Sequence, residues 1–480
     1  MIGIVVSRAD SASVNIGEHL LDLADWNELL DESRPDADGG GTVYRLADTE
    51  LRVFDDLHLY LDNADSAFCD PDSESNCDPL SDSDLDLLVF ASRHAGETGP
   101  LLSVHVTGNF GPAEHGGHDH SLAPAAPNAQ ATAFETLTEH APEDYAVGME
   151  GTHHGPTEIN TPSLFIELGS DKPQWNDPSG ARAVAQAILA LRGVDPTTER
   201  TLVGFGGGHY VPRFERVVRE TDWTVGHIGV DWALDAMDDP DKHRPLLQQA
   251  FEQSGSGYAL IDRESPELER VIDDLGYRVV SETWARETTG VPLELVAQLE
   301  HEVETVEDGL RFGERAKQIA TEDGNENGHT DGFTIVDLPT DLLSEANGID
   351  RERTLAAVST HTIAHTTDEG GTRLTETAVL PKSTDRKDLI SAFCTILETK
   401  YDTVERDDDR NRIVVHETAF SPKLARTQGV PEGPAFGRLS NGQRVEVDGT
   451  VVSPSDVREQ RTHMFSYTCL SDARRTCCER

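Results

Sequence analysis

The chain has 480 residues, of which 36% are hydrophobic and 27% charged, and its mean hydropathy is −0.46. This composition supports a buried core beneath an unusually polar surface, and the length predicts two to four domains, or one large domain with an extension. No stretch approaches the roughly 20 apolar residues of a membrane-spanning helix, so we expect no membrane association. The composition therefore excludes membrane and fibrous proteins.

The charge is strongly negative, with 88 Asp and Glu against 40 Lys and Arg and a net charge of −48. The acids are spread along the whole chain, within segments patterned as strands and helices. A folded protein of this charge repels itself at low salt, whereas near-molar salt shortens the Debye length to about 3 Å. We infer a salt-rich cytoplasm of the haloarchaeal kind, in which a nucleic-acid site would have to be a local arginine patch.

The N-terminus and the cysteines both indicate a cytoplasmic protein. The first seven residues are an apolar run without a basic lead or a cleavage site, which predicts a strand rather than a secretion signal. The six cysteines include no CxxC pair, so we expect free thiols rather than disulfides or a cysteine zinc site. We expect a monomer without an obligate protein partner.

Short apolar runs alternate with helix-spaced segments from residue 2 to residue 274. The expected strands are 2–7, 42–46, 51–61, 85–91, 101–106, 145–150, 163–168, 201–205, 224–229 and 257–261. The expected helices are 13–26, 130–140, 178–191, 212–220, 246–253 and 266–274. This alternation predicts an α/β fold with one mostly parallel or mixed central sheet flanked by helices.

Changes in composition divide the chain further. An acidic segment, 62–84, predicts a surface insertion, and a polar segment, 322–332, predicts a linker. We therefore expect a catalytic domain over 1–321 and a C-terminal α+β extension over 333–480, whose role stays open.

Four polar clusters follow expected strands. They are Ser92-Arg93-His94-Ala95-Gly96, then His105 with Thr107-Gly108-Asn109, then Glu150-Gly151-Thr152-His153-His154-Gly155-Pro156-Thr157 with Glu167 on the next strand, and Gly206-Gly207-Gly208-His209-Tyr210 with His227 one strand later. Because ligands bind beyond the carboxyl ends of parallel strands, we expect one shared site at one rim of the sheet. A fifth histidine-rich tract, 115–120, predicts a solvated loop.

These residue types suit hydrolysis. Histidine and glutamate act as general bases or hold zinc, and glycine turns present N–H groups to a developing oxyanion. Neighbouring His153 and His154 would point to opposite faces of a strand unless a turn redirects them. The candidate catalytic residues are His153, His154, Glu167 and His209, and the candidate metal ligands are these four and His94. The candidate substrate-binding residues are Ser92, Arg93, Asn109, Gly151, Thr152, Gly206, Gly207 and Gly208.

Taken in this order, the clusters resemble the D-aminoacyl-tRNA deacylase family of archaea and plants, over roughly Met1 to Leu310. The resemblance implies hydrolysis of the ester between a D-amino acid and the 3′ end of tRNA, a role in chiral proofreading and D-amino acid detoxification, dependence on one or two Zn²⁺ ions, and a peptidyl-tRNA hydrolase-like or phosphorylase-like fold. The clusters alone also fit a zinc-dependent amidase or peptidase, or a non-catalytic tRNA-binding protein, and they leave zinc and metal-free chemistry both open.

Overall fold

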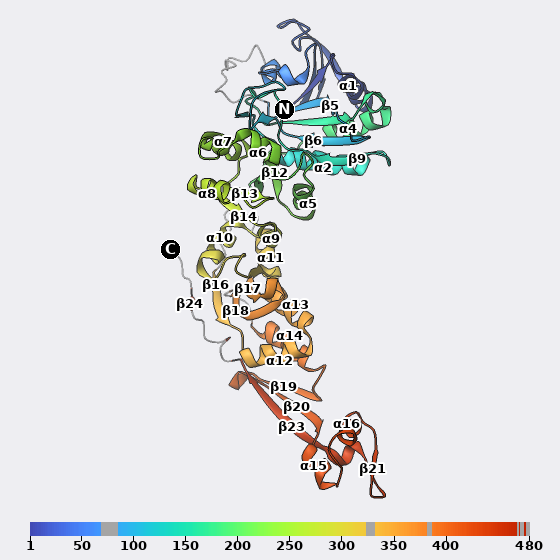
Figure 1. The fold of residues 1–480 in the computed structure, drawn as a ribbon, viewed down its shortest axis with the longest axis vertical. Coiled ribbons are helices and arrows are strands. Elements are labelled where there is room, and N and C mark those ends of the chain that lie inside the picture. Colours follow the sequence, from blue (N-terminus) through green and yellow to red (C-terminus); the bar gives the residue numbers. More distant parts are fainter. Residues whose placement is uncertain (69–84, 323–331, 382–385, 468–469, 471–474, 477–480) are drawn as a thin grey trace. The chain divides into compact units, whose positions relative to one another are not determined.

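The computed structural model describes residues 1–68, 85–322, 332–381, 386–467, 470 and 475–476, in two compact units, Met1–Thr289 and Gly290–Arg480 (Figure 1). Most of the expected acidic insertion (69–84), most of the expected linker (323–331) and five of the six cysteines lie outside the described residues. None of the helices in the described ranges is long and apolar enough to cross a membrane.

The first unit contains an eight-stranded mixed sheet, in the order β2-β3-β4-β1-β5-β10-β6-β9. Strands β1, β4, β5 and β10 run parallel, whereas β6 and β9 run antiparallel to β10. The strands are β1 (Ile2–Ser7), β2 (Asn27–Asp31), β3 (Gly41–Leu46), β4 (Thr49–Phe54), β5 (Leu87–Arg93), β6 (Leu101–His105), β9 (Ala146–Met149) and β10 (Ser163–Gly169). The carboxyl ends of β5 and β6 therefore lie at opposite ends of the sheet, so the clusters after these two strands do not both follow carboxyl ends at one rim, although we expected them to.

The central strands are continuous apolar runs because both faces of the sheet are covered. Helices α1 (Ser11–Leu23) and α4 (Pro178–Ala190) pack against each other and against β5. The other face carries an aromatic row, in which the Phe90 and Phe165 rings stack with centroids 4.5 Å apart. Asp10 fixes the start of α1 by accepting hydrogen bonds from the N–H groups of Ala12 and Ser13.

The mixed sheet flanked by helices confirms the expected α/β fold, and the strands that follow β10 in the first unit form an additional four-stranded parallel sheet, in the order β12-β11-β13-β14. Its elements are β11 (Thr201–Phe205), α5 (Pro212–Glu220), β12 (Thr224–Gly229), α6 (Asp231–Met237), α7 (Arg244–Ser254), β13 (Tyr258–Ile261), α8 (Pro266–Asp274), β14 (Arg278–Val280) and α9 (Glu282–Glu287). The segment after β9 joins the sheets, because Gly151 N–H donates to His209 O and Thr152 N–H to Ile228 O. Helix α2 (Pro127–His140) packs on β6, β9 and β12.

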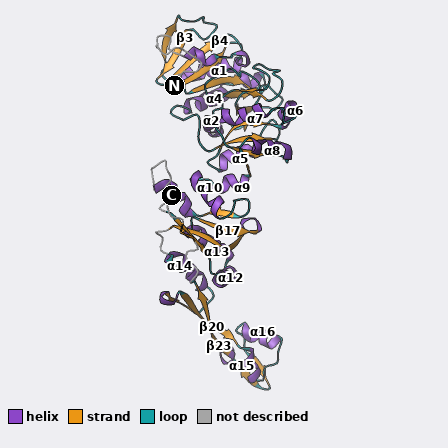
Figure 2. Cartoon of the chain, turned by 90° about the vertical axis from the view of Figure 1, so that its left-hand side faces the viewer, coloured by secondary structure: helices purple, strands orange, loops and turns teal. Residues whose placement is uncertain are grey.

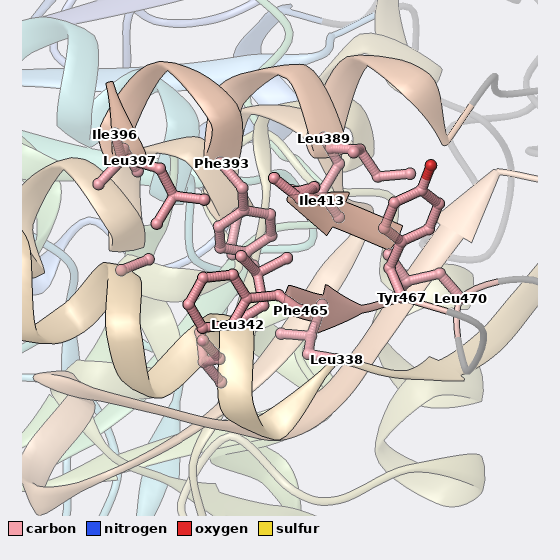
Figure 3. Close-up of a cluster of buried hydrophobic side chains, with 14 of the residues drawn as sticks. Leu338, Leu342, Leu389, Phe393, Ile396, Leu397, Ile413, Phe465, Tyr467 and Leu470 are labelled. Carbon is pink, nitrogen blue, oxygen red and sulfur yellow. The ribbon is translucent and has the colours of Figure 1, made fainter. Parts of the chain in front are cut away.

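The second unit is α+β, as expected (Figure 2). Helices α12 (Thr340–Ile349) and α14 (Lys387–Leu397) enclose an apolar core with strand residues Ile413 and Phe465 (Figure 3). The other elements are α10 (Leu293–Glu302), β15 (Leu310–Phe312), α11 (Glu314–Glu322), β16 (Phe333–Asp337), α13 (Arg351–His361), β17 (Ala364–Asp368), β18 (Arg373–Pro381), β19 (Thr403–Asp407), β20 (Arg412–Phe420), β23 (Arg458–Ser466) and β24 (Arg475–Thr476).

The aromatic row also holds a histidine, and this gives the first testable prediction. His58 packs edge-on against Phe90 and Phe165, and burial lowers its pKa to about 3. The unfolded chain binds this proton near the ordinary pKa of 6.5, so the folding stability is complete above that pH and is lost as the pH falls towards 3. We expect His58→Gln to remove about 2 kcal/mol of the destabilisation that acid causes at pH 5.

Chemical denaturation in molar KCl at pH 7.5 and pH 5 measures this effect. His140→Gln, on the exposed end of α2, is the control. Equal losses of stability on acidification in the wild type and the His58→Gln variant would contradict the prediction.

Candidate functional site

Three imidazoles meet over the aromatic face of the large sheet. His105 ends β6 opposite Phe165, and its ring centroid lies 4.3 Å from that of His153 and 4.9 Å from that of His154. One ligand atom from each of the three lies within 4.8 Å of the others, so together they could hold a metal ion. We call His105, His153 and His154 the imidazole group.

A turn aims both neighbouring histidines at the same place. His154 has a left-handed φ of 46°, and the centroids of its ring and the His153 ring are 4.4 Å apart. Gly155 follows, and a Cβ there would overlap the backbone of Gly116 and Gly117. The 115–120 tract therefore packs on this turn, with Gly155 N–H donating to His115 O, while His115, His118 and Asp119 stay exposed, as expected of a solvated loop.

The hydrogen bonds of the imidazole group fix which nitrogens carry lone pairs. The Nδ1 atoms lie 3.2 Å from Val106 O in His105, 2.8 Å from Gly151 O in His153 and 2.6 Å from Gly155 O in His154. A carbonyl only accepts, so each Nδ1 carries a proton, and in its neutral form each ring keeps its lone pair on Nε2. Backbone carbonyls commonly orient metal-binding histidines in this way.

A second group, His94, Glu150 and His209, adjoins the first and also offers ligand atoms within 4.8 Å of one another. We call it the Glu150 group. Glu150 Oε2 lies 2.6 Å from His209 Nε2 and 3.8 Å from His153 Nε2, and Oε1 lies 3.7 Å from His94 Nε2. Tyr210 OH lies 3.1 Å from His94 Nε2. Glu150 thus links histidines that follow strands of both sheets.

Burial and neighbouring side chains shift the pKa values of several groups in the site. Burial would raise the pKa of Glu150, but the hydrogen bond with His209 and the nearby histidines hold that pKa well below its ordinary value. Burial and the neighbouring imidazoles hold the pKa values of His153 and His154 well below their ordinary value. Burial would also lower the pKa of His105, but the Glu167 carboxylate outweighs it and raises the pKa. The site therefore contains an ionised Glu150 beside two imidazoles, His153 and His154, that burial keeps neutral.

The donor set fits zinc. Within the described ranges, the buried Nε2 of His105 and Oε1 of Glu150 have no hydrogen-bond partner, although burying an unpaired polar atom costs roughly 1–3 kcal/mol. Three histidines, each oriented by a backbone carbonyl, are a ligand set that catalytic zinc uses. A cation at the imidazole group would satisfy the unpaired nitrogen, which is the physical reason to place zinc there.

The comparisons identify the family. The family model for D-aminoacyl-tRNA deacylase matches residues 81–280. A D-aminoacyl-tRNA deacylase of Natronomonas pharaonis is 50% identical over 467 residues, which cover 97% of this chain and 100% of the relative. The chain belongs to the D-aminoacyl-tRNA deacylase family. This confirms the resemblance and the expected class of enzyme, a hydrolase.

Other relatives agree with this identification. A D-aminoacyl-tRNA deacylase of Haloarcula marismortui is 47% identical over 478 residues, covering 98% of this chain and 100% of the relative, and haloarchaeal relatives agree with the charge. One of Methanoregula boonei is 33% identical, covering 79% of this chain and 85% of the relative. A crystal structure described as a conserved protein of unknown function has a TM-score of 0.52 at 27% identity, covering 60% of this chain and 98% of that chain.

The structure brings most, but not all, of the candidate metal ligands into the imidazole group or the Glu150 group. His94, His153, His154 and His209 all belong to one of the two groups. Glu167 belongs to neither group and lies 3.6 Å from His105 Nε2. The candidate ligands omit His105 and Glu150, although both belong to the polar clusters that follow expected strands. Glu150 ends an apolar run directly before Gly151, and a charged residue in that position is the signal that could have made it a candidate ligand.

Several candidate substrate-binding groups are already engaged. The N–H groups of Gly151, Thr152 and Gly206 donate to backbone carbonyls, so any oxyanion role falls to Gly207 and Gly208. The Asn109 amide donates to the carbonyls of Gly116 and His118, which holds the 115–120 tract in place.

His227 lies outside both groups. It contacts Thr152 Oγ1 and Ala123 O, and burial lowers its pKa to about 4, so we assign it to structure. Ser92 is buried opposite Glu167, and the Arg93 guanidinium lies 5.1 Å from the Trp175 ring centroid.

Proposed function

We propose that this chain hydrolyses the ester of D-aminoacyl-tRNA, releasing the free D-amino acid and tRNA. The single observation that carries the proposal is the joining of the imidazole group and the Glu150 group in a chain of this family. The activity serves chiral proofreading and removes D-amino acids from tRNA.

We assign the two groups different tasks. The imidazole group would hold zinc, which supplies a Lewis acid for the ester carbonyl and for the negative charge that develops on it. His209 is half-exposed and paired with the buried Glu150, so it is placed to accept a proton from the attacking water. As the bond between the carbonyl carbon and the ribose oxygen breaks, His209 returns this proton to the ribose oxygen.

Glu150, Arg93 and the shape of the pocket have supporting roles. Glu150 stays ionised and stabilises the His209 imidazolium, as a carboxylate does in other histidine-base pairs. Arg93 is the candidate contact for a phosphate of the RNA. The shape of the pocket at the amino acid Cα would select the D form, because an L side chain would misalign the ester.

Turnover of matched substrates tests the proposal. In molar KCl, we expect release of D-tyrosine from D-tyrosyl-tRNA, at least about a hundredfold slower release of L-tyrosine from L-tyrosyl-tRNA, and no hydrolysis of D-tyrosine amide. Rapid hydrolysis of the amide would indicate a small-substrate amidase instead. Binding of tRNA without hydrolysis would indicate a non-catalytic protein.

A further inference from the structure

A small module interrupts the long antiparallel pair β20–β23 of the second unit (Figure 1). Residues 421–457, which we call the tip module, have a core of their own that includes Ala425, Leu439 and Val452. The module consists of α15 (Pro422–Thr427), α16 (Pro434–Ser440), β21 (Val445–Val447) and β22 (Thr450–Val452). It is therefore a folded element rather than a loose loop between two strands.

The charge of this region departs from that of the chain. Residues 421–463, the tip module and the start of β23, contain five acids and six Lys or Arg residues, whereas the whole chain has 88 acids against 40. The acidic surface elsewhere repels a polyanion, and this region does not. It is thus a place where an RNA could approach an otherwise strongly acidic protein.

Three of these cations lack an internal partner. Arg438, Arg444 and Arg458 are exposed and, among the described side chains, form no ion pair or hydrogen bond. Arginines elsewhere are often paired, and Arg213, Arg216 and Arg286 all contact Glu282. An arginine without a carboxylate keeps all its donors for an external anion, and its planar fork suits phosphate.

Three glycine turns of the tip module leave room for the backbone of a bound molecule to approach. Gly433, Gly442 and Gly449 have positive φ, and a Cβ on any of them would meet nothing within 4 Å. Because these glycines carry no side chain, such turns allow close approach of another chain. Exposed arginines beside open glycine turns are features that suit a phosphate backbone better than an apolar protein partner.

We propose that the tip module is an RNA-contacting surface that binds the tRNA part of the substrate through Arg438, Arg444 and Arg458. The inference rests on the proposed function, because it assigns this surface to the same substrate. It predicts that the tip module contributes to affinity for tRNA and not to the chemistry of the ester. High salt weakens each phosphate contact, so several arginines must act together.

The test uses the full chain in molar KCl with two substrates, D-tyrosyl-tRNA and the small ester D-tyrosyl-adenosine. For the double variant Arg438→Gln/Arg444→Gln we expect about tenfold weaker binding of uncharged tRNA, a matching rise in KM for D-tyrosyl-tRNA and an unchanged kcat. Turnover of D-tyrosyl-adenosine should not change, which also shows that the variant is folded. Arg182→Gln, exposed on α4, is the matched control and should change nothing.

Each outcome decides one question. If the double variant binds tRNA as the wild type does while D-tyrosyl-tRNA is hydrolysed normally, the inference fails and the proposed function stands. A protein partner for the tip module would then be the remaining interpretation. If the wild type binds tRNA through these arginines but hydrolyses neither ester, the inference stands and the proposed function fails.

Discussion

Replacing Glu150 by glutamine is expected to lower kcat for D-aminoacyl-tRNA by about 10³-fold, with little change in KM. The amide keeps the size of the side chain but removes the negative charge that lies 2.6 Å from His209 Nε2. His209 then loses the group that orients it and stabilises its protonated form. The buried carboxylate is also the link between His94, His153 and His209.

Glu158→Gln is the matched control for this experiment. Glu158 is exposed and pairs with His118, so its replacement should leave kcat within about twofold of the wild type. Single-turnover rates and thermal melting in molar KCl separate a catalytic loss from unfolding. A Glu150→Gln variant with wild-type single-turnover rates would rule out the Glu150–His209 pair as the proton acceptor.

Removal of zinc is expected to abolish turnover, by at least about 10²-fold, and zinc should restore it. The protein purified in high salt should contain zinc that a chelator removes, because the imidazole group offers three converging imidazoles and the buried Nε2 of His105 has no hydrogen-bond partner. His105→Ala deletes one of these nitrogens, and we expect it to lower the zinc content and the affinity for added zinc about a hundredfold.

Metal analysis by mass spectrometry provides a readout that does not depend on activity. His118→Ala, which removes an exposed histidine outside both groups, should retain the wild-type zinc content. Full activity of metal-free protein would contradict the zinc assignment and leave a histidine base as the source of the nucleophile. Zinc bound equally well by the His105→Ala variant would exclude the imidazole group as its site.

Many of the helices and strands could be predicted, because each has its own hydrophobic periodicity in the sequence. The bounds of β11, α5, β12 and α8 agree with the expected ranges. Directions and partners of strands could not be predicted in the same way. An apolar run is equally compatible with a parallel or an antiparallel neighbour, so the reversal of β6 and β9 and the division into two sheets appear only in the fold.

The candidate site shows the same division. His153, His154 and His209 stand in conspicuous glycine-rich turns and could be found from the chain alone. His105 ends a buried strand, where a histidine is more often structural, and only its register opposite Phe165 brings it over the same face as Glu167. The position of Glu150 beside His209 depends on the isolated β-bridge between Glu150 and Tyr210, which joins segments far apart in the sequence.

The amino-acid sequence alone therefore determined the residue types, the acidic salt-adapted surface and the α/β class, since these depend on composition and on local periodicity. Tertiary structure alone decided which histidines form the imidazole group, which glycine N–H groups donate to backbone carbonyls and where the Glu150 carboxylate lies. The reason is physical: hydrogen-bond partners and distances of a few ångströms depend on strand register and on turn geometry, and a one-residue shift in register would turn His105 to the other face of the sheet.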